Sequence, residues 1–208
     1  MLIMYTYRFI YYSLLSFLLL PLAGCIGGST PPAQFYLLEP IGQNENPSTE
    51  LTEKPVVALG PVRVPRYVDR PQIIRASGKN MYQLSELNRW AESLDDNISR
   101  VLVQNLSQLA SVNTVLANGS SRARQATLRV AVNIREFHVN SEGQAGLNAQ
   151  WQIIRGDDTL LNRQVSYHSP ASTTDYAVMV AALNDCLDRM SRELAGALQQ
   201  ALKERQIP

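Results

Sequence analysis

The stretch LRVAVNIREFHV, residues 128–139, decides the fold of this chain, because its apolar and polar residues alternate one by one. Side chains of a β-strand point alternately to the two faces of a sheet, so this spacing predicts a strand with one buried face. The apolar set occupies even-numbered positions as far as Ile134 and odd-numbered positions from Phe137 onward. One extra residue near 135–136 explains this change of phase, and we therefore expect a β-bulge there.

Two more strands follow closely in the sequence. Apolar residues recur at every second position on both sides of Trp151 and again around Val165, which predicts two further strands. Gly156-Asp157-Asp158 provides a tight turn between them. Strands joined by short turns pair in an antiparallel manner, so residues 126–167 are expected to form an antiparallel meander.

The first half of the chain supplies shorter strands. Residues 56–65 form a β segment that Gly60-Pro61 interrupts. Because proline cannot donate to a central ladder, we expect this segment to lie at an edge or to contain a bulge. A hairpin follows, with strands at 72–76 and 81–84, and short strands are also expected at 35–38 and 113–117.

Two segments have the spacing of amphipathic helices. Residues 94–110 carry apolar side chains at intervals of three and four, and Ser93 stands at the N-cap position. The last helix begins near 174–175 and keeps one apolar stripe as far as Ala201. The predicted fold class is therefore α/β. A single domain over residues 34–208 is expected, in which a mixed, largely antiparallel sheet packs with two main helices as a two-layer or three-layer sandwich.

The N-terminal segment has the features of a bacterial lipoprotein signal. Its mostly apolar run, residues 9–22, is about 14 residues long, too short to cross a hydrocarbon core of about 30 Å. The run leads into Leu22-Ala23-Gly24-Cys25, which fits the lipobox pattern. We expect removal of residues 1–24 as a signal peptide, a diacylglyceryl group on the thiol of Cys25, and a flexible tether over residues 25–33. The alternative is an ordinary signal peptide followed by a chance cysteine.

Lipid attachment determines the expected location. Each buried CH₂ group contributes about 0.8 kcal/mol, so several acyl chains hold a protein permanently on a membrane. Ile26 follows the cysteine in place of aspartate, which in many gram-negative bacteria permits sorting to the outer membrane. We therefore expect a protein held in the outer membrane by its N-terminal lipid, with its domain facing the periplasm.

Charge and cysteine content exclude some classes of protein. Arg8 is the only charged residue among the first 24, so the mature chain would carry 18 basic and 18 acidic side chains. This balance gives no reason to expect a nucleic-acid partner. With Cys25 acylated, Cys186 has no partner for an intramolecular disulfide, and the core must hold by packing alone.

The sequence offers no set of catalytic or metal-binding residues. His138 and His168 are the two histidines, and neither has another ligand type at metal-binding spacing on its own element. Cys186 lies beside the apolar stripe of the last helix, where a thiol behaves as a small apolar group. An exported hydrolase would need a nucleophile beside a base, and the sequence supplies no such pair. We therefore expect no enzyme, no metal and no cofactor.

Polar and aromatic residues gather just before the first helix. Arg89 and Trp90, of the two residue types that dominate protein interfaces, stand among Glu86, Glu92 and Asp95. Such a cluster can form a contact site for another protein. Local packing at the start of the helix is the favoured interpretation of the same residues.

Two motifs resemble those of a known family. GPVRVPRYVDRPQI at residues 60–73 and NRWAESL at residues 88–94 are similar to motifs of the PqiC/YmbA family, the auxiliary lipoprotein components of ABC-type and MCE-type transporters. Trp151 in a central strand and Asp175-Tyr176 before the last helix also match, so the resemblance covers nearly the whole mature chain.

Two positions depart from the family pattern. Val68 replaces the usual leucine, and Ser93 replaces the usual proline. Proline at a helix start and serine at an N-cap both favour the beginning of a helix, so the expected fold is unchanged.

The resemblance implies a non-enzymatic subunit of an intermembrane lipid transport system that supports membrane integrity. It implies a homo-oligomeric ring that receives the outer end of a lipid-conducting tube, built from an MCE-domain protein of the PqiB kind. The motif positions that are candidates for contact with this partner or with another subunit are Arg66, Tyr67, Asp69, Arg70, Arg89 and Trp90. The alternative is that these residues only close the fold between hairpin and helix.

A second functional hypothesis belongs to a different class. In it the domain is a lipid carrier, which itself holds an acyl chain of a phospholipid between helix and sheet. The sequence alone does not separate the two hypotheses.

Overall fold

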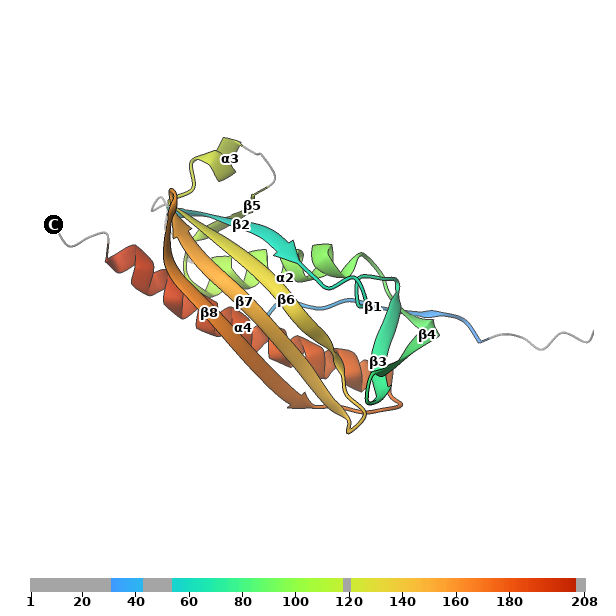
Figure 1. Cartoon of the computed structure of the whole chain (residues 1–208). Coiled ribbons are helices and arrows are strands. Elements are labelled where there is room, and N and C mark those ends of the chain that lie inside the picture. Colours follow the sequence, from blue (N-terminus) through green and yellow to red (C-terminus); the bar gives the residue numbers. More distant parts are fainter. Residues whose placement is uncertain (1–30, 43–53, 118–120, 205–208) are drawn as a thin grey trace, which may run out of the picture. The chain divides into compact units, whose positions relative to one another are not determined.

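The computed structural model describes residues 31–42, 54–117 and 121–204 of the chain (Figure 1). One compact unit, Ala33–Pro208, contains all the helices and strands given below. The expected signal peptide, Cys25 and most of the expected tether lie outside the described residues.

In the described part of the chain, eight strands form one mixed sheet. They are β1 (Gln34–Tyr36), β2 (Val56–Arg63), β3 (Gln72–Gly78), β4 (Met81–Trp90), β5 (Asn113–Leu116), β6 (Leu128–Val139), β7 (Gln144–Arg155) and β8 (Asp158–Pro170). The order is β1-β4-β3-β6-β2-β5, while β7 pairs with β6 and β8 pairs with β7. The pairs β3–β4, β6–β7 and β7–β8 are antiparallel and the other pairs are parallel, so the predicted mixed sheet is confirmed.

The three longest strands, β6, β7 and β8, form the predicted antiparallel meander (Figure 1). The register between β6 and β7 shifts between Ile134 and Glu136, so the bulge expected at 135–136 is confirmed. The extra residue keeps Phe137 and Val139 on the buried face of the sheet, although they stand at odd-numbered positions.

The interrupted strand β2 is not at the edge of the sheet. It pairs in parallel with β6 and with β5, so the expected edge position is wrong. The other expectation, a bulge, is correct, because the register with β6 shifts between Leu59 and Val62. Pairing with β5 reaches only to Leu59, so Pro61 removes no donor from that ladder. Gly60 has a φ of 131°, a conformation that residues with a Cβ rarely adopt, which explains glycine at the interruption.

The described residues form the helices α2 (Leu94–Leu109), α3 (Ser121–Arg124) and α4 (Tyr176–Lys203). Asp175 caps α4, because its Oδ1 accepts hydrogen bonds from the backbone N–H groups of Ala177 at 2.9 Å and Val178 at 3.2 Å. Ser93 holds the N-cap position of α2 but makes no side-chain bond to the helix backbone. Its hydroxyl instead donates to the Asp96 carboxylate at 2.6 Å, so the expected cap is present in position only.

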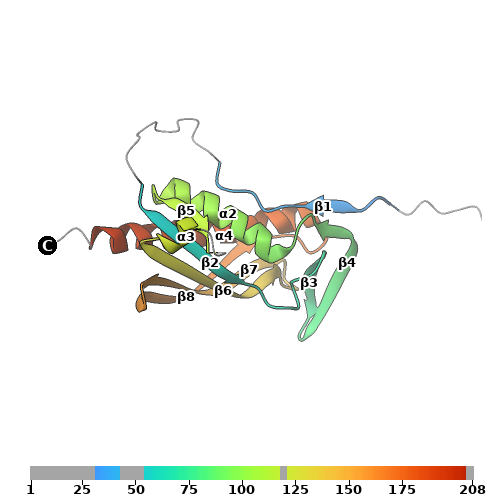
Figure 2. The same ribbon diagram turned by 90° about the horizontal axis from the view of Figure 1, so that it is seen from above.

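The long helices α2 and α4 both pack on one face of the sheet and against each other (Figure 2). Helix α2 covers β2 and β5, while α4 covers β6, β7 and β8. The domain is therefore the two-layer form of the predicted sandwich. The largest side chains buried between the layers include Trp151, Phe137, Ile98, Leu102 and Leu147. Among the described residues, none of the helices has the length and apolar composition needed to cross a membrane.

Asparagine side chains bind the segment that follows β1 to both long helices. The backbone N–H groups of Leu38 and Ile41 donate to Asn97 and Asn105 of α2, at 3.2 Å and 2.8 Å. The N–H group between them, of residue 39, donates to Asn184 of α4 at 2.7 Å. Because Leu38 is also fully buried, this asparagine clamp, made by residues 97, 105 and 184, holds the N-terminal segment firmly to the domain.

Replacement of Asn105 by alanine is expected to lower the free energy of unfolding by about 2 kcal/mol, the cost of leaving a buried polar group without its partner. Asn105 is fully buried, and its Nδ2 also donates to Ser191 Oγ of α4 at 3.0 Å. Urea unfolding of the full chain measures the change. Gln104→Ala, at an exposed amide on the same helix, is the matched control and should change stability by less than about 0.5 kcal/mol. Equal effects of the two substitutions would contradict the clamp.

Candidate docking surface

The GPVRVPRYVDRPQI and NRWAESL motifs, far apart in the sequence, meet in the fold. The backbone N–H of Trp90 donates to the carbonyl of Pro71 at 2.7 Å, which joins the ends of the two motifs. Strand β1 pairs in parallel with the end of β4 and places Phe35 opposite Arg89. The beginning of the domain therefore lies directly beside both motifs.

These segments border a hollow of about 430 Å³ on the surface. Asp69, Arg70, Arg89 and Trp90, four of the six candidate residues, line it together with Phe35. We call these five residues the docking surface. Trp90 is only 5% exposed and belongs largely to the core, whereas Asp69 and Arg70 are exposed. The structure thus brings aromatic and arginine side chains together at one accessible place, as protein interfaces require.

The charges of the docking surface are available to a partner. In the described residues, Asp69, Arg70 and Arg89 have no ion-pair partner within 4.0 Å. Glu92, at the border of the hollow, is already engaged, because its Oε1 lies 2.9 Å from Nε of Arg100. Both signs of charge are therefore present beside an apolar side chain.

Phe35 is the residue of the docking surface that the sequence reasoning did not select. Its side chain is 65% exposed, which is unusual for a large aromatic residue. The available signal was a bulky residue directly after the expected tether. The alternation of apolar and polar residues could not reveal on which face of the sheet Phe35 lies, because β1 has only three residues.

Arg66 and Tyr67, the other two candidates, do not line the hollow. Arg66 is exposed in the turn that follows β2. Tyr67 is half-buried, and its hydroxyl lies 3.1 Å from Nδ1 of His138. Tyr82 of β4 completes an aromatic cluster, with its ring centroid 5.3 Å from those of both Tyr67 and His138. The contacts of Tyr67 are those of a packing residue.

Burial determines the protonation of this aromatic cluster. Burial, with smaller contributions from the neighbouring Tyr82 and Glu136, raises the pKa of Tyr67 to about 12. Burial lowers the pKa of His138, against the opposing effect of the Glu136 carboxylate, whose Oε1 lies 3.6 Å from Nε2. At neutral pH, Tyr67 is therefore an uncharged hydroxyl beside a largely neutral imidazole.

The remaining residues considered for chemistry lie apart from the docking surface. In the portion of the chain that the structure describes, no three His, Cys, Asp or Glu side chains are placed to hold a metal ion. His168 is exposed on β8. Cys186 is fully buried, and burial raises the pKa of its thiol to about 11. Because the thiolate is the reactive form, Cys186 behaves as a small apolar group at neutral pH.

Two crystal structures share this fold. One is of an uncharacterized protein, with a TM-score of 0.67, 19% sequence identity, and coverage of 81% of this chain and 99% of that chain. The other is of a protein from Xanthomonas campestris, with a TM-score of 0.64, 17% identity, and coverage of 84% of this chain and 100% of that chain. At these identities the likeness supports the fold alone.

Sequence comparison identifies the family. The chain is similar to the intermembrane transport lipoprotein PqiC of Escherichia coli strain K12 and to that of Shigella flexneri. Each match is 27% identical over 163 residues, which are 78% of this chain and 83% of the relative. Residues 36–195 match the model of the family described as ABC-type transport auxiliary lipoprotein component. Since this match spans well over half of the chain, the chain belongs to the family of ABC-type transport auxiliary lipoprotein components.

Proposed function

We propose that this chain is the periplasm-facing lipoprotein subunit of an intermembrane lipid transport system, and that it docks the outer end of the transport conduit at the outer membrane. Family membership supports a transport role without catalysis, and similarity to relatives named intermembrane transport lipoproteins supports the system. The observation that carries the proposal is the docking surface, where residues of both family motifs meet in one accessible hollow.

The attachment of the N-terminal segment fits a tethered subunit. If Cys25 carries the lipid, nine residue steps separate it from the start of β1 at Gln34. An extended chain of that length spans at most about 30 Å, so the domain stays close to the membrane surface. Pairing of β1 with β4 and the asparagine clamp connect this segment directly to the docking surface.

The chemistry of the docking surface suits a protein partner. An exposed phenylalanine with arginines beside it is typical of the centre of a protein interface. In such an interface the partner buries these central residues, and polar residues form the rim around them. We propose an MCE-domain protein of the PqiB kind as this partner, and membrane integrity as the physiological outcome.

A second copy of the chain is the other partner we propose, in a homo-oligomeric ring. Strand β8 is 13 residues long and, within the described residues, pairs only with β7. Its outer edge presents backbone donors and acceptors that a neighbouring subunit can use.

Capture from gently solubilised membranes tests the docking role. The tagged full chain should recover an MCE-domain protein, identified by mass spectrometry. The double variant Phe35→Ala, Arg70→Ala should recover about tenfold less, because loss of two interface residues of these types costs more than about 1.4 kcal/mol. Leu116→Ala, at a 41% exposed leucine on β5, is the control and should recover as much as the wild type.

Two outcomes would contradict the proposal. Absence of any MCE-domain protein with the wild-type chain would reject the docking role itself. Undiminished recovery by the double variant would instead reject the docking surface as the place of contact.

A further inference from the structure

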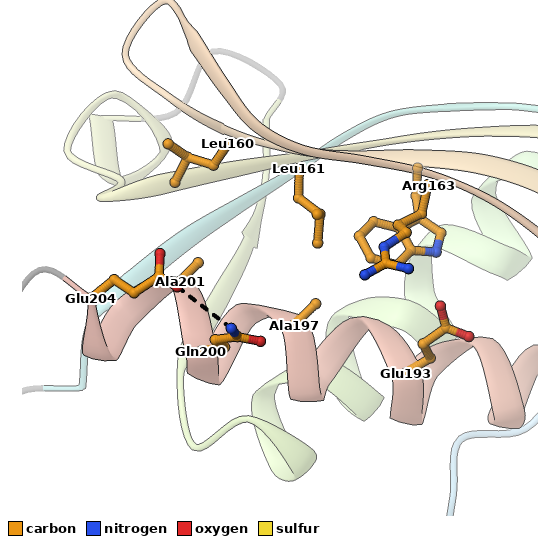
Figure 3. A pocket seen from close by; sticks show the side chains of 9 residues that line it. Leu160, Leu161, Arg163, Glu193, Ala197, Gln200, Ala201 and Glu204 are labelled. Carbon is orange, nitrogen blue, oxygen red and sulfur yellow. Dashed lines mark hydrogen bonds between the residues drawn. The ribbon is translucent and has the colours of Figure 1, made fainter.

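A second cavity lies between α4 and the strands β7 and β8, on the helix side of the sheet (Figure 3). Its volume is about 430 Å³, within the range of small-molecule sites. Leu161 and Arg163 project from β8 toward the helix, and Glu193 and Ala197 project from α4 toward the sheet (Figure 3). Trp151 of β7 also lines the cavity.

One end of the cavity contains two hydrogen-bond donors without acceptors. Trp151 is 1% exposed, and its buried Nε1 has no hydrogen-bond partner in the described chain. Arg163, opposite Trp151 in the β7–β8 pair, is exposed, and its side chain has no ion-pair or hydrogen-bond partner among the described residues. A buried donor without an acceptor is costly and is rare in folded proteins, so its presence beside a cavity indicates a missing acceptor.

The acid at this end does not supply that acceptor. The carboxylate of Glu193 accepts a hydrogen bond from the hydroxyl of Tyr167. This contact adds to burial in raising the pKa of Tyr167, so the hydroxyl keeps its proton at neutral pH. Glu193 is therefore occupied by a neighbour within the fold, and no bond from Trp151 or Arg163 reaches it.

The rest of the cavity is bordered by leucines of β8 and, along α4, by alanines together with the polar Gln200 and Glu204. Leu161 of β8 points toward α4 across it, and Leu160, Ala197 and Ala201 border the same part. From residue 193 to residue 201 the helix rises about 12 Å, so the cavity extends along α4 beyond its two donors, with apolar side chains first and with Gln200 and Glu204 toward its far end. The small alanine side chains leave the space that a chain of methylene groups can fill.

We propose that this cavity binds a single acyl chain whose anionic head, a carboxylate or a phosphate, accepts hydrogen bonds from Trp151 Nε1 and Arg163. The methylene chain then lies between Leu161 of β8 and Ala197 of α4. A guanidinium and a second N–H donor together suit an anionic acceptor better than a neutral one. The inference goes beyond the docking role, because the domain would hold a lipid whether or not a partner protein is present.

The two tryptophans of the chain, Trp90 and Trp151, allow a direct test in the full chain purified in detergent. Trp90→Phe leaves only the emission of Trp151, and Trp151→Phe leaves only that of Trp90. The probe is 2-bromostearate, whose bromine atom lies next to the carboxylate and quenches an indole that it contacts. We expect saturable quenching of Trp151 and none of Trp90, and competition by unlabelled stearate.

Variants of the cavity identify the contacts. In the Trp90→Phe background, Arg163→Gln should weaken probe binding about tenfold through loss of a charge-assisted hydrogen bond. Arg129→Gln, at an exposed arginine of β6 on the opposite face of the sheet, is the matched control and should bind as before. Ala197→Phe should fill the cavity and abolish quenching. Thermal unfolding of each variant establishes that it folds.

Three results would overturn the inference. Absence of quenching would show that the cavity holds no acyl chain. Equal quenching of Trp90 and Trp151 would show that the probe reports only the detergent micelle. Displacement of the probe by inorganic phosphate as effectively as by stearate would show that the site recognises a free anion. None of these results depends on capture of an MCE-domain protein, so failure here is distinguishable from failure of the docking role.

Discussion

Replacement of Cys25 by alanine is expected to abolish incorporation of labelled palmitate completely and to release the chain from the membrane fraction. The lipobox Leu22-Ala23-Gly24-Cys25 provides the thiol that would carry the diacylglyceryl group. Each buried CH₂ group contributes about 0.8 kcal/mol to the free energy of membrane binding. Without its acyl chains, the protein therefore loses its anchor in the membrane. Metabolic labelling followed by separation of membrane and soluble fractions measures both effects.

The second cysteine provides a matched control. Cys186 is fully buried, and its thiol has a pKa raised to about 11. A buried, protonated thiol is not available for acylation, so Cys186→Ala should leave labelling and membrane association unchanged. Labelling that persists in Cys25→Ala, or that is lost in Cys186→Ala, would contradict lipid attachment at Cys25 and with it the proposed tethering of the domain.

Local periodicity accounts for the parts of the fold that the sequence predicted. The alternation of residues 128–139 determines which face of β6 is buried, and its change of phase reveals the bulge confirmed between Ile134 and Glu136. The three- and four-residue spacing of apolar residues likewise locates α2 and α4 to within a few residues. These signals depend only on neighbours along the chain.

The position of β2 in the sheet depended on distant contacts. The segment Gly60-Pro61 signalled an interruption correctly, but not that β5 and β6 lie on the two sides of the strand. Parallel pairing joins residues far apart in the sequence and leaves no local periodic signal. The choice between two layers and three also depended on where both helices pack.

The residues of the docking surface could be predicted only in part, because some of them are brought together by contacts between distant parts of the sequence. Its motif residues were visible in the sequence, whereas Phe35 joins them only because β1 pairs with the end of β4, across more than 50 positions. The asparagine clamp and the cavity beside Trp151 involve three or more elements each. Their component residues have no distinctive spacing, so only the assembled fold brings them together.

Replacement of Phe137 by alanine is expected to lower the free energy of unfolding by about 3–5 kcal/mol, a large share of the 5–15 kcal/mol typical of a folded domain. Phe137 follows the bulge of β6, pairs with Leu147 of β7 and is 2% exposed. The loss combines the transfer of an aromatic ring to water with the cavity left in the core. Urea unfolding should show a lower midpoint with an unchanged slope.

Phe35→Ala makes the same chemical change at a 65% exposed position and provides the control. Its effect on the free energy of unfolding should stay within about 0.5 kcal/mol, because little apolar surface is lost from the core. The pair of variants also tests the bulge. Without the extra residue, the side chain of Phe137 would point to the opposite, solvent-facing side of the sheet, and its exposure would resemble that of Phe35. Equal losses at the two positions would mean that β6 continues without a bulge, and the buried face assigned beyond Ile134 would be wrong.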